Sequence, residues 1–423
     1  MNKKNQSIRG IHDLLPKDLI IWNYIENVLK KIFNNYGYSE IRLPILEKTN
    51  LFQKSIGNST DIIEKEMYTF LDKKGNSISL RPESTASCCR AILQNNLLKT
   101  VMQKFWYFGP MFRYERPQKE RFRQFYQFGI EVFGLKSNLI DLEIILIMKR
   151  CFKQLKLIKF VYLEINTIGS LESRNIYKKK LIKFLNSKKH LFTDQEIITC
   201  KKNPLRILDS KNKNIQKILK NAPKLIDYIT KKEKKNFLKF CKNIKNMSIN
   251  YKINHNLVRG LDYYNDLVFE WKSNFLGSQN TICGGGRYDY LINKIYGRNI
   301  PALGFAIGME RLISLVNITK SIILKNDQTD IYFIQEKNSK NLDNIKIIEN
   351  IRNNFPNLKI IFDYHVGNIK KKLIRAKKFN AKIVIINKFK KNKNFIIFKK
   401  YNENKESIIL KKQIIKKIFN YFK

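Results

Sequence analysis

The chain has 423 residues, which is too long for one ordinary hydrophobic core and predicts two or three domains. Hydrophobic residues make up 43% and charged residues 28%, which is typical of a folded soluble protein and argues against a disordered one. The sequence has no uninterrupted apolar run of about 18 residues, so no membrane span is expected. The basic start MNKKNQSIRG has no apolar run behind it and does not resemble a signal peptide.

Lysine and arginine number 82 against 35 acidic residues, giving a formal net charge of +47. This excess fits an RNA or DNA partner, but the abundance of Lys, Asn, Ile, Phe and Tyr fits the codon bias of an AT-rich genome equally well. The six cysteines form no C-x-x-C pair, and Cys88 and Cys89 are adjacent. We therefore expect a reduced, cytoplasmic protein, and the four scattered histidines make a histidine-based metal site improbable.

The predicted elements begin with an amphipathic helix at 17–35, followed by a turn and a strand in GYSEIRLPILE. Period-two patterning at 78–133 predicts an antiparallel sheet, which resumes at 257. Between them, 170–247 reads as an inserted module of lysine-rich amphipathic helices. A linker is expected at 317–328, and strands and helices then alternate, which predicts an α/β domain with a mostly parallel sheet. The expected domains are 1–325 and 326–423.

The segment LRPESTASCCRA, 80–91, contains the first candidate binding residues. If it is extended, Arg81, Glu83 and Thr85 point to one face. A carboxylate and a hydroxyl on that face could hold an ammonium group. Taken alone, an ordinary ion pair with a nearby cation is the more frequent arrangement.

The segment 105–134 places Arg113 on one predicted strand and Gln127, Gly129 and Glu131 on one face of the next. Gly129 leaves room between two polar groups, whereas the alternating residues Phe128, Ile130 and Val132 would pack as core. This combination predicts a polar floor under a binding pocket.

Arg113 and Arg259 lie in strand-like, aromatic surroundings. An arginine fork holds two oxygens of a phosphate or carboxylate and stays charged, so two such groups suit charge developing at phosphorus. The run CGGGRYDYL matches neither a Walker loop nor a dinucleotide fingerprint, and a tight turn is its simplest explanation. In ALGFAIGMERL, Gly304 and Gly308 could leave a slot for a base and Arg311 could reach a phosphate tail; the alternative is a helix start with an exposed arginine.

Seven segments in this order together resemble the histidyl-tRNA synthetases, a family of class II aminoacyl-tRNA synthetases. They are IRGIHDLLP, GYSEIRLPILE, LRPESTASCCRA, FRYERPQKERFRQFYQFGIEVFG, LVRGLDYYNDLVFEW, CGGGRYDYL and ALGFAIGMERL. The resemblance covers essentially the whole chain. It implies an α+β catalytic domain with a helical insertion, an anticodon-binding-type α/β domain, and a homodimer formed through the segment that carries Pro44.

The resemblance also implies a role for each matching residue. Arg259 and Arg113 would be catalytic, with Arg259 against the α-phosphate where other class II enzymes use a metal ion. Glu115, Arg121, Arg311 and Arg113 would bind ATP, and Gln118 and Arg123 would meet the tRNA acceptor end. The histidine substrate would contact Glu83, Ser84, Thr85, Arg113, Gln127, Glu131, Arg259, Tyr263 and Tyr264, with Glu131 and Tyr264 at its imidazole.

The implied reaction forms histidyl-adenylate and pyrophosphate from L-histidine and ATP, with Mg²⁺ on the phosphates, and then transfers histidine to the 3′ end of tRNA(His). Two positions depart from the family pattern: Ser84 stands where glycine is usual, and Gly284 where alanine is commoner. Three alternatives remain: a catalytically silent paralogue such as the regulatory subunit of a histidine-biosynthesis transferase, a basic RNA-binding scaffold, and a class II enzyme for another amino acid.

Overall fold

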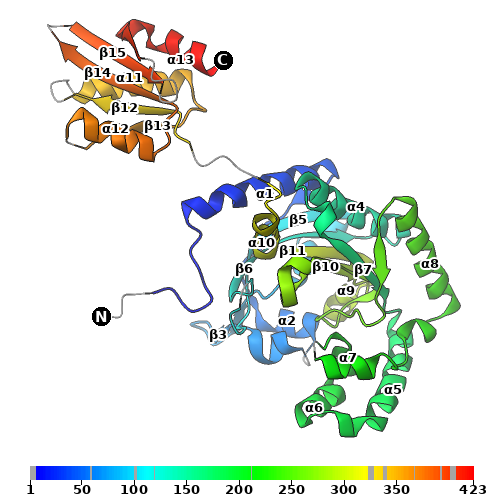
Figure 1. The fold of residues 1–423 in the computed structure, drawn as a ribbon. Helices are drawn as coiled ribbons and strands as arrows, with labels where there is room; N and C mark the ends of the chain where they lie inside the picture. The colour runs from blue at the N-terminus through cyan, green and yellow to red at the C-terminus, as the bar shows by residue number, and fades with distance from the viewer. Residues whose placement is uncertain are drawn as a thin grey trace. The chain divides into compact units, whose positions relative to one another are not determined.

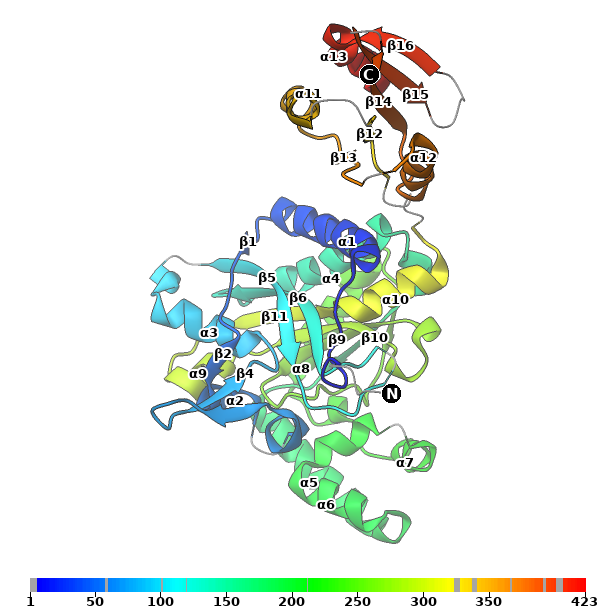
Figure 2. The same ribbon diagram turned by 90° about the vertical axis from the view of Figure 1, so that its left-hand side faces the viewer.

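The structure is a computed structural model. It describes residues 6–423 except 58–59, 100–101, 119, 211, 323–327, 337–340, 366, 391–392 and 401–405. The chain separates into two compact units, Met1–Ile323 and Leu324–Lys423, which are described here one at a time (Figures 1 and 2).

The first unit contains an eight-stranded sheet with the order β1-β5-β6-β11-β10-β9-β7-β8. Its six central strands pair antiparallel, but β1 and β8 pair parallel to their neighbours at the two edges. The prediction of an antiparallel sheet is therefore right for the centre and wrong for the edges, where two short strands enter in the same direction as β5 and β7. The strands are β1 Ser39–Glu40, β5 Gln103–Phe112, β6 Gln124–Phe133, β7 Tyr162–Thr167, β8 Tyr251–Ile253, β9 Asn265–Lys272, β10 Thr281–Arg287 and β11 Ala302–Gly308.

One face of this sheet is covered by α1, α4 and α10 (Figure 2), which share a hydrophobic core with it. Phe128, Ile130 and Val132 are completely buried in this core, as their alternation on β6 predicted. The opposite face of β6, β9, β10 and β11 carries the polar residues of the candidate site. The helices are α1 Pro16–Asn35, α2 Thr49–Ile56, α3 Thr85–Gln94, α4 Asn138–Gln154, α5 Leu171–Ser187, α6 Asp194–Lys202, α7 Lys213–Leu219, α8 Lys231–Asn246, α9 Leu291–Tyr296 and α10 Met309–Thr319.

Residues 80–91 do not form the predicted extended segment. A strand, β4 Ser77–Leu80, ends there, and α3 begins at Thr85. The Glu83 carboxylate accepts hydrogen bonds from the backbone N–H groups of Thr85 (2.7 Å) and Ala86 (2.9 Å), which satisfies free donors at the helix start. The period-two interpretation was wrong here because this capping interaction ends the strand and starts a helix within four residues.

Two further local predictions are wrong. Arg259 lies on a loop, because the strand that follows it, β9, begins only at Asn265. The glycine run 284–286 is not a tight turn but part of β10. The linker predicted at 317–328 begins later, since α10 continues to Thr319, and the rest of that linker falls largely outside the described residues.

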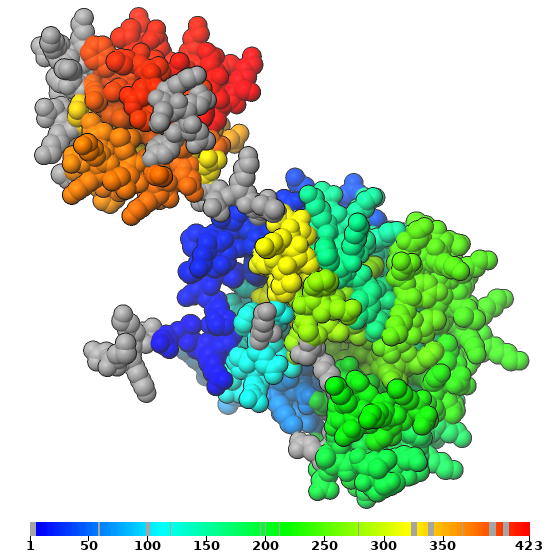
Figure 3. All heavy atoms as spheres, in the orientation of Figure 1, coloured from blue at the N-terminus to red at the C-terminus, as the bar shows by residue number. Residues whose placement is uncertain are grey.

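The inserted module is helical, as predicted, and comprises α5 to α8 (green in Figure 3). Its last helix starts with a capping box in which Thr230 and Glu233 exchange side-chain and backbone hydrogen bonds. Glu233 also accepts from Ser170 N (2.7 Å) and Ser173 Oγ (2.8 Å), so the beginnings of α5 and α8 are tied together. The first and last helices of the module are thus joined at their N-terminal ends.

A small three-stranded sheet, β2-β4-β3, lies beside α2, with β2 Leu46–Lys48 and β3 Thr69–Leu71. On one face, Thr49 and Thr69 hydrogen-bond to Ser79 at 2.9 Å each. The other face carries Leu46, Phe70, Ile78 and Leu80. Pro44, predicted to lie within a strand, falls between β1 and β2.

The second unit is an α/β domain with the strand order β13-β12-β14-β15-β16. The pairings of β12 with β13 and β14 are parallel, whereas β14-β15 and β15-β16 are antiparallel. The prediction of a mostly parallel sheet is therefore correct for two of the four pairings. The sequence analysis missed β16, whose short alternating pattern follows a lysine-rich segment. The elements are β12 Ile331–Gln335, α11 Asn341–Asn354, β13 Ile360–Phe362, α12 Ile369–Lys378, β14 Ile383–Lys390, β15 Lys393–Lys400, β16 Glu406–Leu410 and α13 Ile414–Phe422.

In the part of the chain that the structure describes, no helix combines the length and apolarity needed to cross a bilayer.

Candidate active site

A cavity of about 290 Å³ opens on the polar face of the central strands of the first unit. Most of the residues singled out from the sequence line it, although they come from two helix starts, one strand and two loops. Those that line it are Glu83, Thr85, Arg113, Glu115, Arg121, Gln127, Glu131, Arg259, Tyr263, Tyr264 and Arg311.

Three of the singled-out residues are not among those lining the cavity. Ser84 is fully buried and donates to the sulfur of Met111 (3.5 Å), and Arg123 stacks over the ring of Tyr114 at 3.7 Å. Gln118 sits in a tight turn, exchanging backbone hydrogen bonds of 3.1 Å with Arg121.

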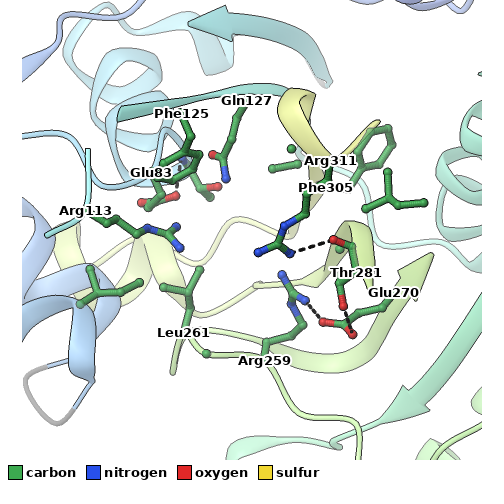
Figure 4. A pocket seen from close by; sticks show the side chains of 18 of the residues that line it. Glu83, Arg113, Phe125, Gln127, Arg259, Leu261, Glu270, Thr281, Phe305 and Arg311 are labelled. Atoms are coloured by element: carbon green, nitrogen blue, oxygen red, sulfur yellow. Dashed lines mark hydrogen bonds and ion pairs between the residues drawn. The ribbon is translucent and has the colours of Figure 1, made fainter. Parts of the chain in front are cut away.

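Arg113 follows β5, and its guanidinium points into the cavity (Figure 4). Its Nε donates to the carbonyl of Pro82 (3.0 Å), and its guanidinium carbon lies 5.2 Å from the ring centre of Phe125. Burial and the neighbouring Arg259 cation lower the pKa of Arg113 from its ordinary value. A buried cation of this kind gains from an anionic ligand, because the ligand would offset the cost of its desolvation.

Arg259 enters the cavity from the loop before β9 and forms an ion pair with Glu270. Burial alone would lower the pKa of Arg259, but Glu270 and the nearby tyrosine oxygens hold it above its ordinary value. A Cβ atom at Gly284 would lie 2.6 Å from the guanidinium carbon, so this glycine provides the space that the side chain occupies. Arg259 is therefore charged, enclosed and closely fitted.

Arg311 comes from the first turn of α10, as predicted. It donates to the carbonyl of Thr281 (2.8 Å) and to Gln279 Oε1 (3.1 Å). Burial, together with the cations of Arg121 and Arg113, lowers its pKa. Figure 4 shows the guanidinium groups of Arg259 and Arg311 pointing toward one another and that of Arg113 pointing in from across the cavity. Such a cluster suits a ligand with several negative charges.

The floor of the cavity is centred on Glu131 of β6. Its Oε1 accepts from Thr85 Oγ1 (2.6 Å), and its Oε2 accepts from the hydroxyl of Tyr288. Burial raises the pKa of Glu131 to about 8, although these hydrogen bonds oppose the shift. A Cβ atom at Gly304 would lie 2.8 Å from Glu131 Cδ, so β11 has no space for a side chain at this position.

The room that the sequence analysis expected above Gly129 is not empty. A Cβ atom there would lie 2.7 Å from Cε1 of Tyr107, which is paired with Gly129 across β5 and β6. The phenol of Tyr107 thus occupies that room beside Glu131. Free space in the cavity lies toward Gln127, whose Oε1 is buried and has no hydrogen-bond partner. An unpaired buried acceptor calls for a donor from a ligand.

Tyrosine rings enclose the inner part of the site. The ring centres of Tyr263 and Tyr264 are 4.7 Å apart, and Tyr263 and Tyr288 are 5.6 Å apart with nearly perpendicular planes. Carboxylate, amide and phenol groups inside an aromatic enclosure can recognise a small ligand with both hydrogen-bond donors and acceptors.

Sequence reasoning missed four residues of the site. Tyr107, Glu270 and Thr281 line the cavity, and Tyr288 reaches Glu131 from the far end of β10. Tyr107 and Glu270 sit at alternating strand positions that were read as ordinary sheet residues, and only the fold brings them to the site. Tyr288 stands two residues after the glycine run, so the motif CGGGRYDYL already contained this residue. Glu115 was singled out, but its pairing with Arg121 within one loop was not foreseen.

The comparisons with known proteins agree with this geometry. A family model described as histidyl-tRNA synthetase matches residues 10–312. A histidine--tRNA ligase of Buchnera aphidicola subsp. Schizaphis graminum is 51% identical over 91% of this chain and 90% of its own length. One of Blochmanniella floridana is 49% identical over 90% and 88%. The apo histidyl-tRNA synthetase of S. aureus superposes with a TM-score of 0.79 at 29% identity, covering 98% of this chain and 99% of that one.

These matches show a class II aminoacyl-tRNA synthetase fold. The chain belongs to the histidyl-tRNA synthetase family. A Bacillus halodurans protein described as an ATP phosphoribosyltransferase regulatory subunit/histidyl-tRNA synthetase shares the fold, with a TM-score of 0.66 at 20% identity.

The raised pKa of Glu131 predicts a pH-dependent contribution to stability. The folded state, with a pKa of about 8, holds this proton more tightly than the unfolded state, with a value near 4.5. The contribution is complete below pH 4.5 and is lost as the pH rises through about 8. Glu131→Gln should remove part of this decline, on the order of 1 kcal/mol or more. Melting temperatures at pH 5, 6, 7 and 8 measure it; parallel wild-type and variant curves would contradict the buried protonated carboxyl.

Proposed function

We propose that this protein ligates histidine to its tRNA, through histidyl-adenylate and pyrophosphate in a first step and transfer to the tRNA 3′ end in a second. The observation that carries the proposal is the arrangement of Arg113, Arg259 and Arg311 around one cavity whose floor is Glu131. Membership of the histidyl-tRNA synthetase family supports it. The relatives named histidine--tRNA ligase are matched over about nine tenths of their length.

In the first step the histidine carboxylate attacks the α-phosphorus of ATP and displaces pyrophosphate. Arg113 and Arg259 flank the reacting phosphorus, and Arg311 holds the terminal phosphate. The protein moves no proton in this step, so positioning and charge neutralisation provide the acceleration. Glu115 and Arg121 lie together at the cavity rim and would place the adenine.

Histidine would occupy the inner part of the cavity. Its ammonium group suits the acceptor oxygens of Glu83 and Gln127, next to Thr85, and its imidazole suits Glu131 and Tyr264. A carboxyl and a phenol can satisfy one ring N–H and one ring nitrogen, and an isosteric amino acid without them would leave those groups unpaired. Tyr263 closes the enclosure by packing against Tyr264.

Magnesium would arrive with the substrate, on the phosphates of ATP. The carboxylates that face the cavity already hold partners: Glu83 binds two backbone N–H groups, Glu115 binds Arg121, and Glu270 binds Arg259. This donor set does not fit a metal ion held by the protein alone. Phosphate oxygens supply the hard ligands that Mg²⁺ prefers.

The tRNA would reach the cavity past the loop 115–123, where we propose that Gln118 and Arg123 contact the acceptor end. The second unit, 324–423, would bind the anticodon region. The net charge of +47 supports contacts with the phosphate backbone and a strong dependence of tRNA affinity on salt.

We also propose a homodimer, in which the small sheet faces a second copy. Leu46, Phe70, Ile78 and Leu80 share one face of β2, β3 and β4 by their register. Leu46 and Phe70 are 45% and 46% exposed, whereas Glu47 and Ser79 at the middle of the opposite face are buried. A sheet whose apolar face points outward is typical of an association surface.

Histidine should be the only one of the twenty amino acids that supports fast ATP–pyrophosphate exchange. The measurement separates the alternatives: no exchange with any amino acid would favour a silent paralogue or an RNA-binding scaffold, and exchange with another amino acid would favour a different class II enzyme. A site built to hydrogen-bond its substrate rejects an analogue that lacks the bonding groups by about 10⁴-fold, because the buried polar groups of the site are then unpaired.

Arg259→Ala should slow adenylate formation by about 100-fold or more, because a preorganised cation at the phosphorus is removed. The melting temperature should change little, since Arg259 lies on a loop at the cavity. Histidine-dependent exchange at the wild-type rate would end the assignment of this residue to the α-phosphate.

Phe70→Glu should convert a dimer into monomers, because a carboxylate would be desolvated at the centre of the apolar face. Leu191→Glu is the matched control: Leu191 is similarly exposed, at 52%, but lies in the helical insertion. Light scattering coupled to size exclusion gives the mass of each. A wild-type monomer, or a dimeric Phe70→Glu variant, would refute the proposed interface.

A further inference from the structure

Four charged side chains of alternating sign, from two neighbouring strands and a loop, form a row that ends at the cavity. Glu164 on β7 binds Lys272 (2.9 Å), Lys272 binds Glu270 (3.0 Å), both on β9, and Glu270 binds Arg259. In the sheet register Glu164 lies directly opposite Glu270, a like-charge pair that the Lys272 ammonium bridges. The cation proposed to act at phosphorus is therefore paired with a carboxylate that the sheet holds in place.

Glu270 itself is held firmly. Besides Lys272, it accepts a hydrogen bond from Thr281 Oγ1 on β10 (3.0 Å). Burial alone would raise the pKa of Glu270, but Arg259, Lys272 and these hydrogen bonds keep it below the ordinary value. The carboxylate thus stays ionised inside the protein and offers Arg259 a fixed counter-charge.

Apart from Tyr264, whose ring centre lies 5.8 Å from the guanidinium carbon, Arg259 has less support than Glu270. It lies on a loop next to Gly260, where the structure leaves open space, and its Nε is buried without a hydrogen-bond partner. Its position is set by what surrounds the guanidinium: Glu270 on one side and bare backbone at Gly284 on the other. Glu270 and Gly284 are directly opposite each other on β9 and β10, so the two constraints come from one site in the sheet.

We propose that Glu270 is a positioning residue that holds the Arg259 guanidinium at the reacting phosphorus, with Gly284 providing the space for it. Thr281 extends the same arrangement to Arg311: its hydroxyl donates to Glu270 and its carbonyl accepts from Arg311 (2.8 Å), as Figure 4 shows. One carboxylate and one threonine therefore set the spacing of two guanidinium groups that would otherwise repel each other. This inference rests on the role proposed above for Arg259.

The test is Glu270→Gln, which keeps the shape of the side chain and removes its charge. Single-turnover adenylate formation should slow by about 10- to 100-fold, as expected when a catalytic group is misplaced by about 1 Å, while the KM for histidine stays close to wild type. Glu164→Gln is the matched control, because Glu164 shares Lys272 with Glu270 but does not contact Arg259. It should leave the rate nearly unchanged.

A double-mutant cycle distinguishes positioning from a general structural effect. If Glu270 acts through Arg259, adding Glu270→Gln to the Arg259→Ala variant should lower the rate of adenylate formation only slightly further.

Three results have distinct meanings. Equal rates for Glu270→Gln and Glu164→Gln would overturn the inference, and so would the same further loss with and without Arg259. If Arg259→Ala alone proved as fast as wild type, the proposed role of Arg259 would fall instead.

Discussion

The active site depends on keeping guanidinium groups charged inside the protein. Burial lowers the pKa of both Arg113 and Arg311, so each loses solvation that must be compensated. Backbone carbonyls supply part of this: Pro82 accepts from Arg113 and Thr281 accepts from Arg311. Only Arg259 has a full counter-charge, in Glu270. A polyphosphate in the cavity would offset the cost of burying Arg113 and Arg311.

The second requirement is that certain strand positions have no side chain. This requirement explains three glycines whose role the sequence did not reveal. Gly129, Gly284 and Gly304 each lie on a strand, beneath a polar side chain from elsewhere: Tyr107, Arg259 and Glu131, respectively. Glycine is needed at these positions because it has no side chain, and not because the backbone adopts an unusual angle. Two of the three were interpreted as leaving room for a ligand, whereas the room is taken by functional side chains. No local pattern distinguishes these cases, because the occupant comes from another part of the chain.

Local periodicity was sufficient to predict α1, the helical insertion, the α/β character of the second unit and the buried alternation on β6. It failed where a contact distant in sequence, or a cap, decided the outcome. The helix α3 was mistaken for a strand although Cys88, Cys89 and Ile92, all fully buried, follow helical spacing. The family resemblance named eleven of the residues that line the cavity, but Glu270 and Tyr288 required the sheet register and the fold. Which face of a strand meets a cavity is a tertiary property.

The helical insertion and the catalytic loop also depend on each other. Arg174 of α5 is buried and donates to the carbonyl of Tyr264 (2.7 Å), and Asn203, after α6, donates to Asp262 Oδ1 (3.1 Å). The loop carrying Arg259 is therefore fixed by the sheet through its side chain and by the insertion through its backbone. A module that looks like an independent addition in the sequence is part of the active-site support.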